Sequence, residues 1–168
     1  MTRRWAMALV LLLAAPLSAC ATTPQEAPVT LTLEDAKADV RAAEDEVIAL
    51  IPSGVVTETL PRTETSRTLF ACDGPDTYYW PGGAQLQIDP STDSGAVIGA
   101  IGDAWSAKDG WKVTWVERGE KDGVYHLDML RDDGLHLAVM NLEGNTLLDI
   151  SSFSPCFGLD DYDPNRSY

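Results

Sequence analysis

The last third of the chain alternates apolar and polar residues in four short segments, a pattern typical of β-strands that bury one face. The segments are separated by Gly119–Gly123, Asp132–Gly134 and Gly144-Asn145, whose residue types favour hairpin turns. The pattern therefore predicts a four-stranded antiparallel meander. Its buried face is expected to contain Trp111, Val113, Trp115, Tyr125, Leu127, Met129, Leu137, Val139, Leu148 and Ile150.

The two tighter turns determine how these strands pair. A three-residue loop at Asp132–Gly134 places Leu127 opposite Val139. A two-residue turn at Gly144-Asn145 places Val139 opposite Ile150. With these loops the apolar residues share one face, whereas a slip of one residue would turn a whole strand over.

Two segments have the three- and four-residue spacing of an amphipathic helix. The first begins after Thr32, a residue suited to cap a helix, and ends at Pro52 and Gly54. The second is expected to start near Ser91–Ser94 and to run to about Ala107. The apolar stripes consist of Leu33, Ala36, Val40, Ala43, Val47 and Leu50 in the first helix, and of Val97, Ile98, Ile101, Ala104 and Trp105 in the second.

The region between the helices predicts shorter strands. Residues 55–60 and 66–72 are expected to form two strands joined by a polar turn, and residues 84–88 a half-buried strand. Proline and glycine favour turns at residues 74–76 and 81–83. Two helices on the apolar face of an antiparallel sheet make a two-layer α+β fold. We expect one such domain over residues 32–158, followed by an acidic tail over residues 159–168.

The first 20 residues have the organisation of a bacterial export signal. Arg3 and Arg4 precede an apolar run that ends in Leu17-Ser18-Ala19-Cys20. These four residues match the lipobox, so the chain resembles a bacterial lipoprotein precursor. The excess of Arg over Lys and the abundance of Ala hint at an actinobacterial one. The resemblance implies removal of residues 1–19, acylation of the Cys20 sulfur and a lipid anchor on the extracytoplasmic side of the cell membrane.

An uncleaved transmembrane anchor is the alternative interpretation of this segment. However, the apolar run from Trp5 to Ala19 is shorter than the roughly 20 residues that span a bilayer. Residues 20–31 are expected to form the lipid-bearing cysteine and a flexible tether, because they contain prolines and few bulky side chains. Stable anchoring takes at least two acyl chains, such as palmitate, and the lipid modification would supply them.

The charge of the chain limits its partners. The net charge is −14, and without Arg3 and Arg4 it becomes −16, since 10 basic residues remain against 26 acidic ones. Such a surface repels nucleic acids and anionic lipid headgroups. We therefore expect no nucleic-acid partner. The same charge would keep a tethered protein soluble and away from the membrane surface.

Cys72 and Cys156 remain when Cys20 carries the lipid. Two cysteines in an exported chain are most simply a disulfide. The bridge would close a loop of about 84 residues and stabilise the fold by roughly 4 kcal/mol. A redox-active pair is the alternative, but it ordinarily needs a C-x-x-C spacing or an activating neighbour, and neither is visible.

The two histidines are not expected to bind a metal ion together. In the register above, His126 and His136 lie on the outer face, on the order of 13 Å apart along the strand direction. Zinc–nitrogen bonds measure only about 2 Å. Asp128 lies between them and could contact His136 diagonally.

The chain contains no nucleophile elbow, zinc-protease motif, phosphate-binding loop or dinucleotide fingerprint. We therefore expect neither enzymatic activity nor a cofactor. Asp160, Asp161 and Asp163 with Asn165 offer oxygen ligands suited to calcium. A disordered acidic tail is the interpretation that we favour for this segment.

The best candidate for ligand binding is Tyr78-Tyr79-Trp80, just before an expected turn. Such aromatic side chains can stack on sugar rings, anchor a protein partner, or cap the core. The sequence as a whole favours a non-enzymatic, membrane-tethered binding or assembly module of the bacterial envelope, with an envelope protein or a glycan as its partner. The alternatives are a carrier that holds a hydrophobic or sugar ligand between helices and sheet, and a carboxylate-based envelope hydrolase.

Overall fold

The fold was analysed in a computed structural model that describes residues 31–62, 64–66, 68–120 and 122–168. The lipobox with Cys20, and the tether up to residue 30, lie outside the described residues. The described chain is a sheet-dominated α+β structure, as expected, with two helices, a six-stranded antiparallel sheet and a smaller three-stranded sheet. No helix among these residues is both long and apolar enough to cross a membrane.

Helix α1 spans Leu33–Leu50 and begins at the expected cap. The Thr32 hydroxyl oxygen accepts a hydrogen bond from the backbone N–H of Asp35 at 3.2 Å, which satisfies one of the free donors of the first turn. Helix α2 spans Ser94–Ser106 and is capped by Asp93 in the same way. Each helix buries one stripe, which includes Ala36, Val40, Ala43 and Val47 in α1 and Val97, Ile98, Ile101 and Trp105 in α2.

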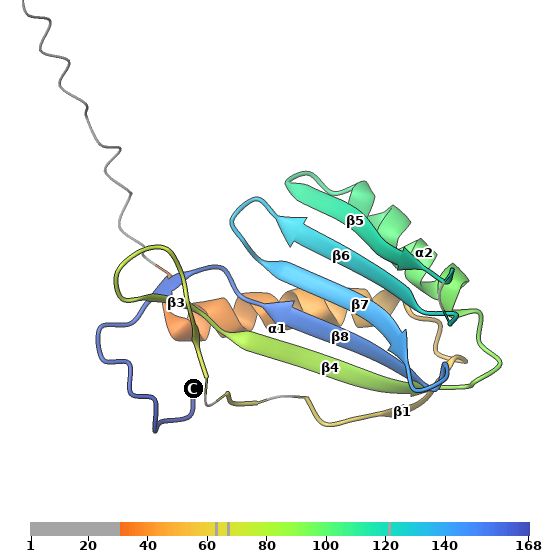
Figure 1. Ribbon diagram of the computed structural model, residues 1–168, viewed down its shortest axis with the longest axis horizontal. Helices are drawn as coiled ribbons and strands as arrows, with labels where there is room; N and C mark the ends of the chain where they lie inside the picture. Colours follow the sequence, from red (N-terminus) through yellow and green to blue (C-terminus); the bar gives the residue numbers. More distant parts are fainter. Residues whose placement is uncertain (1–30, 63, 67, 121) are drawn as a thin grey trace, which may run out of the picture.

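The large sheet has the strand order β1-β4-β8-β7-β6-β5 (Figure 1). Both helices pack on the same face of this sheet: α1 contacts β4 and β8, and α2 contacts β5, β6 and β7. The small sheet has the order β2-β3-β9. The strands are β1 Val56–Thr59, β2 Phe70–Ala71, β3 Thr77–Tyr79, β4 Pro81–Ile88, β5 Trp111–Arg118, β6 Tyr125–Arg131, β7 His136–Leu142, β8 Leu147–Phe153 and β9 Phe157–Gly158.

The predicted register of the meander is confirmed. Leu127 pairs with Val139, and Val139 pairs with Ile150. The expected core face is buried or packs against the buried core along its whole length. The turn between β7 and β8 is longer than the two-residue turn expected at Gly144-Asn145. The last paired residues are Leu142 and Leu147, which leaves a loop of residues 143–146. Glu143 and Asn145 both have positive φ in that loop.

The expected turn at residues 81–83 is wrong, because β4 already begins at Pro81. The two glycines serve close packing instead of a turn. A Cβ atom on Gly82 would lie 2.5 Å from the Trp80 ring and 2.6 Å from the Ser152 hydroxyl oxygen, which is inside van der Waals contact. Likewise, the two short strands before β3 do not pair with each other: β1 joins β4, and β2 joins β3.

The expectation of a disordered acidic tail is also wrong. Tyr168 is only 4 % exposed and belongs to the buried core. The indole N–H of Trp80 donates to the main-chain oxygen of Tyr168 at 3.2 Å. Ser66 and Tyr168 exchange two backbone hydrogen bonds, and the Tyr162 ring lies 4.8 Å from the Tyr78 ring. The aromatic residues of the tail therefore hold it against the domain.

A carboxyl group is buried on the helix side of the sheet. Glu44 of α1 is 1 % exposed and accepts a hydrogen bond from the Ser152 hydroxyl at 2.5 Å. Burial raises the pKa of Glu44 above its usual range, against the opposing effects of the Ser152 hydrogen bond and of nearby Arg62. The folded protein therefore binds the carboxyl proton of Glu44 more tightly than the unfolded chain does. As a result, the contribution of Glu44 to stability increases as the pH falls toward the pKa of glutamate in the unfolded chain.

We expect Glu44→Gln to raise the free energy of unfolding at about pH 7 and to remove the part of its pH dependence that Glu44 contributes. Glutamine keeps an acceptor for Ser152 but carries no charge that must be desolvated. Urea unfolding at about pH 7 and about pH 5 measures both effects. Glu46→Gln, at an exposed position of the same helix that pairs with Lys108, is the control. An unchanged pH dependence in Glu44→Gln would contradict the prediction.

Candidate functional site

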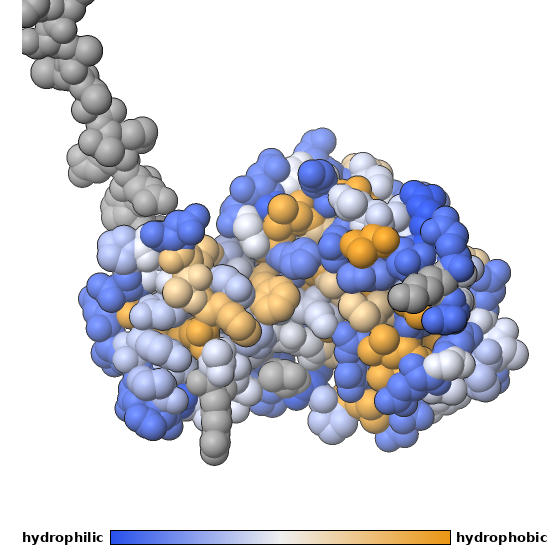
Figure 2. All heavy atoms as spheres, in the orientation of Figure 1, coloured by the Kyte–Doolittle hydropathy of each residue, from blue (hydrophilic) through white to orange (hydrophobic). Residues whose placement is uncertain are grey.

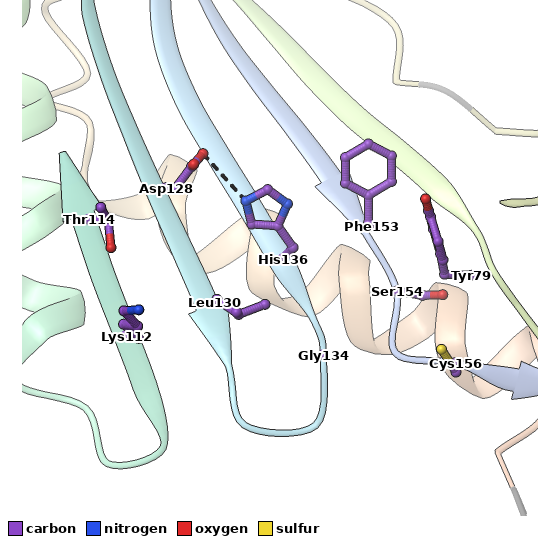
Figure 3. A pocket seen from close by; sticks show the side chains of 10 residues that line it. All are labelled: Tyr79, Lys112, Thr114, Asp128, Leu130, Gly134, His136, Phe153, Ser154 and Cys156. Atoms are coloured by element: carbon purple, nitrogen blue, oxygen red, sulfur yellow. Dashed lines mark ion pairs between the residues drawn. The ribbon is translucent and has the colours of Figure 1, made fainter. Parts of the chain in front are cut away.

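The face of the large sheet opposite to α1 and α2 carries an open groove of about 450 Å³ (Figure 3). The groove crosses the sheet from β5 to β8 and reaches the small sheet at β3. It is lined by Tyr79, Lys112, Thr114, Asp128, Leu130, Gly134, His136, Phe153, Ser154 and Cys156.

Strand alternation explains why these side chains meet. Leu127 and Met129 point into the core, so Asp128 and Leu130 between them point to the open face. The same rule turns His136 outward beside the buried Leu137. The strand residues that line the groove are thus the outward-facing neighbours of buried core residues. Most of them are polar, and a few are apolar.

One wall of the groove continues into a row of rings from four strands, which we call the aromatic row: Phe70, Tyr79, Phe153 and His136. Phe70 stacks on Tyr79 with ring centroids 5.2 Å apart. Tyr79 meets Phe153 edge to face at 5.5 Å, and Phe153 stacks on the His136 imidazole at 5.9 Å. Aromatic pairs in such offset or edge-to-face geometries attract beyond simple burial, so the rings support one another in a defined arrangement.

A polar cluster adjoins the aromatic row. The Nε2 atoms of His126 and His136 lie 3.2 and 3.4 Å from the same Asp128 oxygen, Oδ1. The expected diagonal contact between Asp128 and His136 is therefore confirmed. The two imidazoles, which were not expected to hold one metal ion together, share this carboxylate as a partner because Asp128 lies between them.

His136 lines the groove, as Figure 3 shows, whereas His126 is not part of its lining. Within the described ranges no group of three or more His, Cys, Asp or Glu side chains is arranged to hold a metal ion. Asp128 and His136 thus lie in contact with each other in the lining of the groove.

The predicted aromatic site, Tyr78-Tyr79-Trp80, is divided by the fold. Trp80 is 1 % exposed and lies in the core, and Tyr78 packs on Tyr162 of the tail. Of the three, Tyr79 lines the groove. Sequence reasoning missed Phe153, which follows the outward positions Asp149 and Ser151 on β8. The sequence feature that could have revealed Phe153 is its position: it is an aromatic residue on the face of the strand that was expected to be exposed to solvent.

The expected cysteine pair is at disulfide distance. Cys72 and Cys156 are bonded, with Cα atoms 6.4 Å apart, and Cys156 lines the groove. The bridge joins the turn between β2 and β3 to the segment between β8 and β9. It therefore ties together the two segments that flank Tyr79 and Phe153.

The groove is electrically balanced, unlike the chain as a whole. Lys112 and Asp128 are the lining residues with formal charges, and they have opposite sign, whereas the chain carries a net charge of −14. Lys112 forms no ion pair with any residue that the structure describes. Its ammonium group is therefore available to a ligand in the groove.

Comparisons of the chain with protein-family models, with curated proteins and with solved structures found no match. The interpretation of the groove consequently rests on its own geometry and chemistry.

Replacing both Cys72 and Cys156 by alanine should lower the free energy of unfolding by roughly 4 kcal/mol, because the bridge closes a long loop in the unfolded chain. Urea unfolding of residues 21–168 measures this loss. A reducing agent should have the same effect on the wild-type protein and none on the double variant. Equal unfolding midpoints for the wild type and the double variant would contradict the prediction.

Proposed function

We propose that this protein is a membrane-tethered, non-enzymatic binding module of the bacterial envelope, and that it takes its ligand in the groove on the open face of the sheet. The groove is the observation that carries the proposal. It combines an aromatic wall with oriented polar side chains, which is the usual composition of a ligand site. The lipobox at Leu17–Cys20 supports the tether and the extracytoplasmic location.

A carboxylate hydrolase is less well supported by the geometry. Such an enzyme needs two acids that face each other across a cleft, one of them with a raised pKa. Asp128 is the acidic residue that lines the groove. The pKa of Glu44 is raised by burial, but Glu44 belongs to α1 and packs on the opposite face of the sheet.

A carrier with its ligand between helices and sheet also has little support. The side chains at that interface form a continuous buried cluster, in which Val40, Ile98, Ile101, Leu127 and Ile150 are fully buried. A ligand there would have to displace packed core residues, which costs several kcal/mol. The open groove on the other face requires no such rearrangement.

We expect Cys20→Ala to abolish the lipid anchor, because the thioether to diacylglycerol forms on the Cys20 sulfur. The variant should remain an uncleaved precursor in a bacterial host that processes lipoproteins. Mass spectrometry of the wild-type membrane fraction should find Cys20 acylated and at the N-terminus. An unmodified Cys20 in that fraction would refute the tether.

The role of the groove can be tested with a matched pair of substitutions on β5. Thr114 lines the groove, whereas Val116 is exposed two residues further along the same strand and is not part of the lining. Thr114→Trp should fill the groove and abolish cosedimentation of residues 21–168 with purified host envelopes. Val116→Trp should bind like the wild type. Equal binding by both variants, or no binding by the wild type, would overturn the proposal.

A further inference from the structure

The walls of the groove differ in character. Figure 3 shows Tyr79 and Phe153 along one side, Lys112 and Thr114 along the other, and Asp128 with His136 between them. A ligand in the groove therefore meets aromatic rings on one side, where Phe153 and Tyr79 stand at right angles to each other, and hydrogen-bonding groups on the other. This asymmetry restricts the ligand to molecules that have one apolar face and a polar rim.

The openness of the groove argues against an acyl chain. Figure 2 views the open face of the sheet and shows apolar surface in patches bordered by hydrophilic residues. Apolar ligands are held when most of their surface leaves water. A fatty-acyl chain in this open groove would keep much of its apolar surface in water. A sugar ring would bury its apolar C–H face on the aromatic wall and leave its hydroxyls to polar groups and solvent.

The charges of the chain and of the groove also favour an uncharged ligand. A strongly acidic protein repels anionic ligands over long range. Within the groove, the formal charges of Lys112 and Asp128 balance, which removes the electrostatic reason for a cationic ligand to prefer this site over the many exposed carboxylates. An uncharged ligand with several hydroxyls suits both conditions.

The polar side chains can serve such hydroxyls. Asp128 has a second carboxylate oxygen, Oδ2, besides the one that both imidazoles contact, and an ionised carboxylate accepts several hydrogen bonds. Lys112 can donate up to three hydrogen bonds, and the Thr114 hydroxyl can donate or accept. Hydrogen bonds to charged groups are stronger than neutral ones, so Asp128 and Lys112 would hold hydroxyl groups firmly.

We infer that the groove is a binding site for uncharged hexopyranose glycans. A sugar ring stacks on the face of Phe153, beside the perpendicular Tyr79 ring, while Asp128, Lys112 and Thr114 bind its hydroxyl groups. This inference rests on the proposed function and specifies the ligand class of the same site.

The direct test is an NMR titration of ¹⁵N-labelled residues 21–168, which include the whole folded domain. The neutral probes are chitotetraose, cellotetraose and mannotetraose. The contrasting probes are tetragalacturonate, which is anionic, and laurate, which is an acyl ligand. At least one neutral tetrasaccharide should shift the amide signals of Asp128, His136 and Phe153. Failure of all three neutral probes, or stronger shifts with laurate or tetragalacturonate, would overturn the inference.

Substitutions at Phe153 separate stacking from simple apolar contact. Phe153→Leu keeps an apolar side chain but removes the ring face, and it should weaken glycan binding about tenfold. Phe153→Tyr should bind the glycan with about the wild-type affinity, since it keeps the aromatic ring. Val116→Ala, outside the groove, is the control and should bind like the wild type. Unchanged glycan affinity in Phe153→Leu would contradict stacking.

Asp128→Asn tests the hydrogen bonds to the sugar hydroxyls. It should also lower the affinity for the glycan about tenfold, because a charge-assisted hydrogen bond is replaced by a neutral one.

The failure of this inference is distinct from that of the proposed function. If Thr114→Trp abolishes envelope binding but no neutral tetrasaccharide binds, the glycan is refuted and the groove remains a binding site. If a tetrasaccharide binds but Thr114→Trp leaves envelope binding intact, the envelope role of the groove is refuted.

Discussion

The two-residue period of the β-strands is the constraint on which the rest of this structure depends. Once α1 and α2 seal one face of the large sheet, every inward residue assigns its neighbours to the other face. Leu127 and Met129 place Asp128 outward, and Leu137 places His136 outward. The antiparallel pairing of β6 and β7 then brings the two outward side chains within reach of each other. The groove is thus a direct consequence of how the core is packed.

A second constraint operates at the end of the sheet, where Trp80 joins segments that are far apart in the chain. Its backbone N–H donates to the Ser154 hydroxyl at 2.9 Å, and its indole N–H donates to Tyr168. The ammonium group of Lys37 lies 5.3 Å from the centre of its ring, where a cation–π attraction operates. Because Trp80 is directed into the core, the adjacent Tyr79 is directed to the open face. The aromatic row therefore depends on a buried residue that takes no part in it.

The success and failure of sequence reasoning follow from the range of the interactions. The helices and the meander register were predictable because capping residues, hairpin turns and periodicity act within a few positions, as with Thr32 or Asp132–Gly134. The roles of Gly82, Tyr168 and Glu44 were not predictable. Each depends on a partner brought close by the complete fold: Trp80 and Ser152 are such partners, and the bond from Ser152 to Glu44 spans 108 positions.

The candidate site was only partly predictable for the same reason. Tyr79 stood out as one of three consecutive aromatic residues, but nothing local to it distinguished its role from that of Tyr78 or Trp80. Phe153 gained its place in the groove only when β8 paired with β4 and β7, which put it beside Tyr79 and His136.

The distribution of charge bears on both the proposed tether and the groove. A net charge of −14 spread over the chain repels anionic surfaces, so a protein held to a membrane by its N-terminal end would be pushed away from anionic headgroups and into the surrounding envelope. In the groove, by contrast, the positive charge of Lys112 balances the negative charge of Asp128, and the aromatic side chains carry no charge. If the groove binds a ligand as proposed, the net charge disfavours anionic molecules, and an uncharged ligand would bind through ring contact and hydrogen bonds. The specificity of the proposed site would therefore depend on the arrangement of the aromatic row and on the position of Asp128 beside His136.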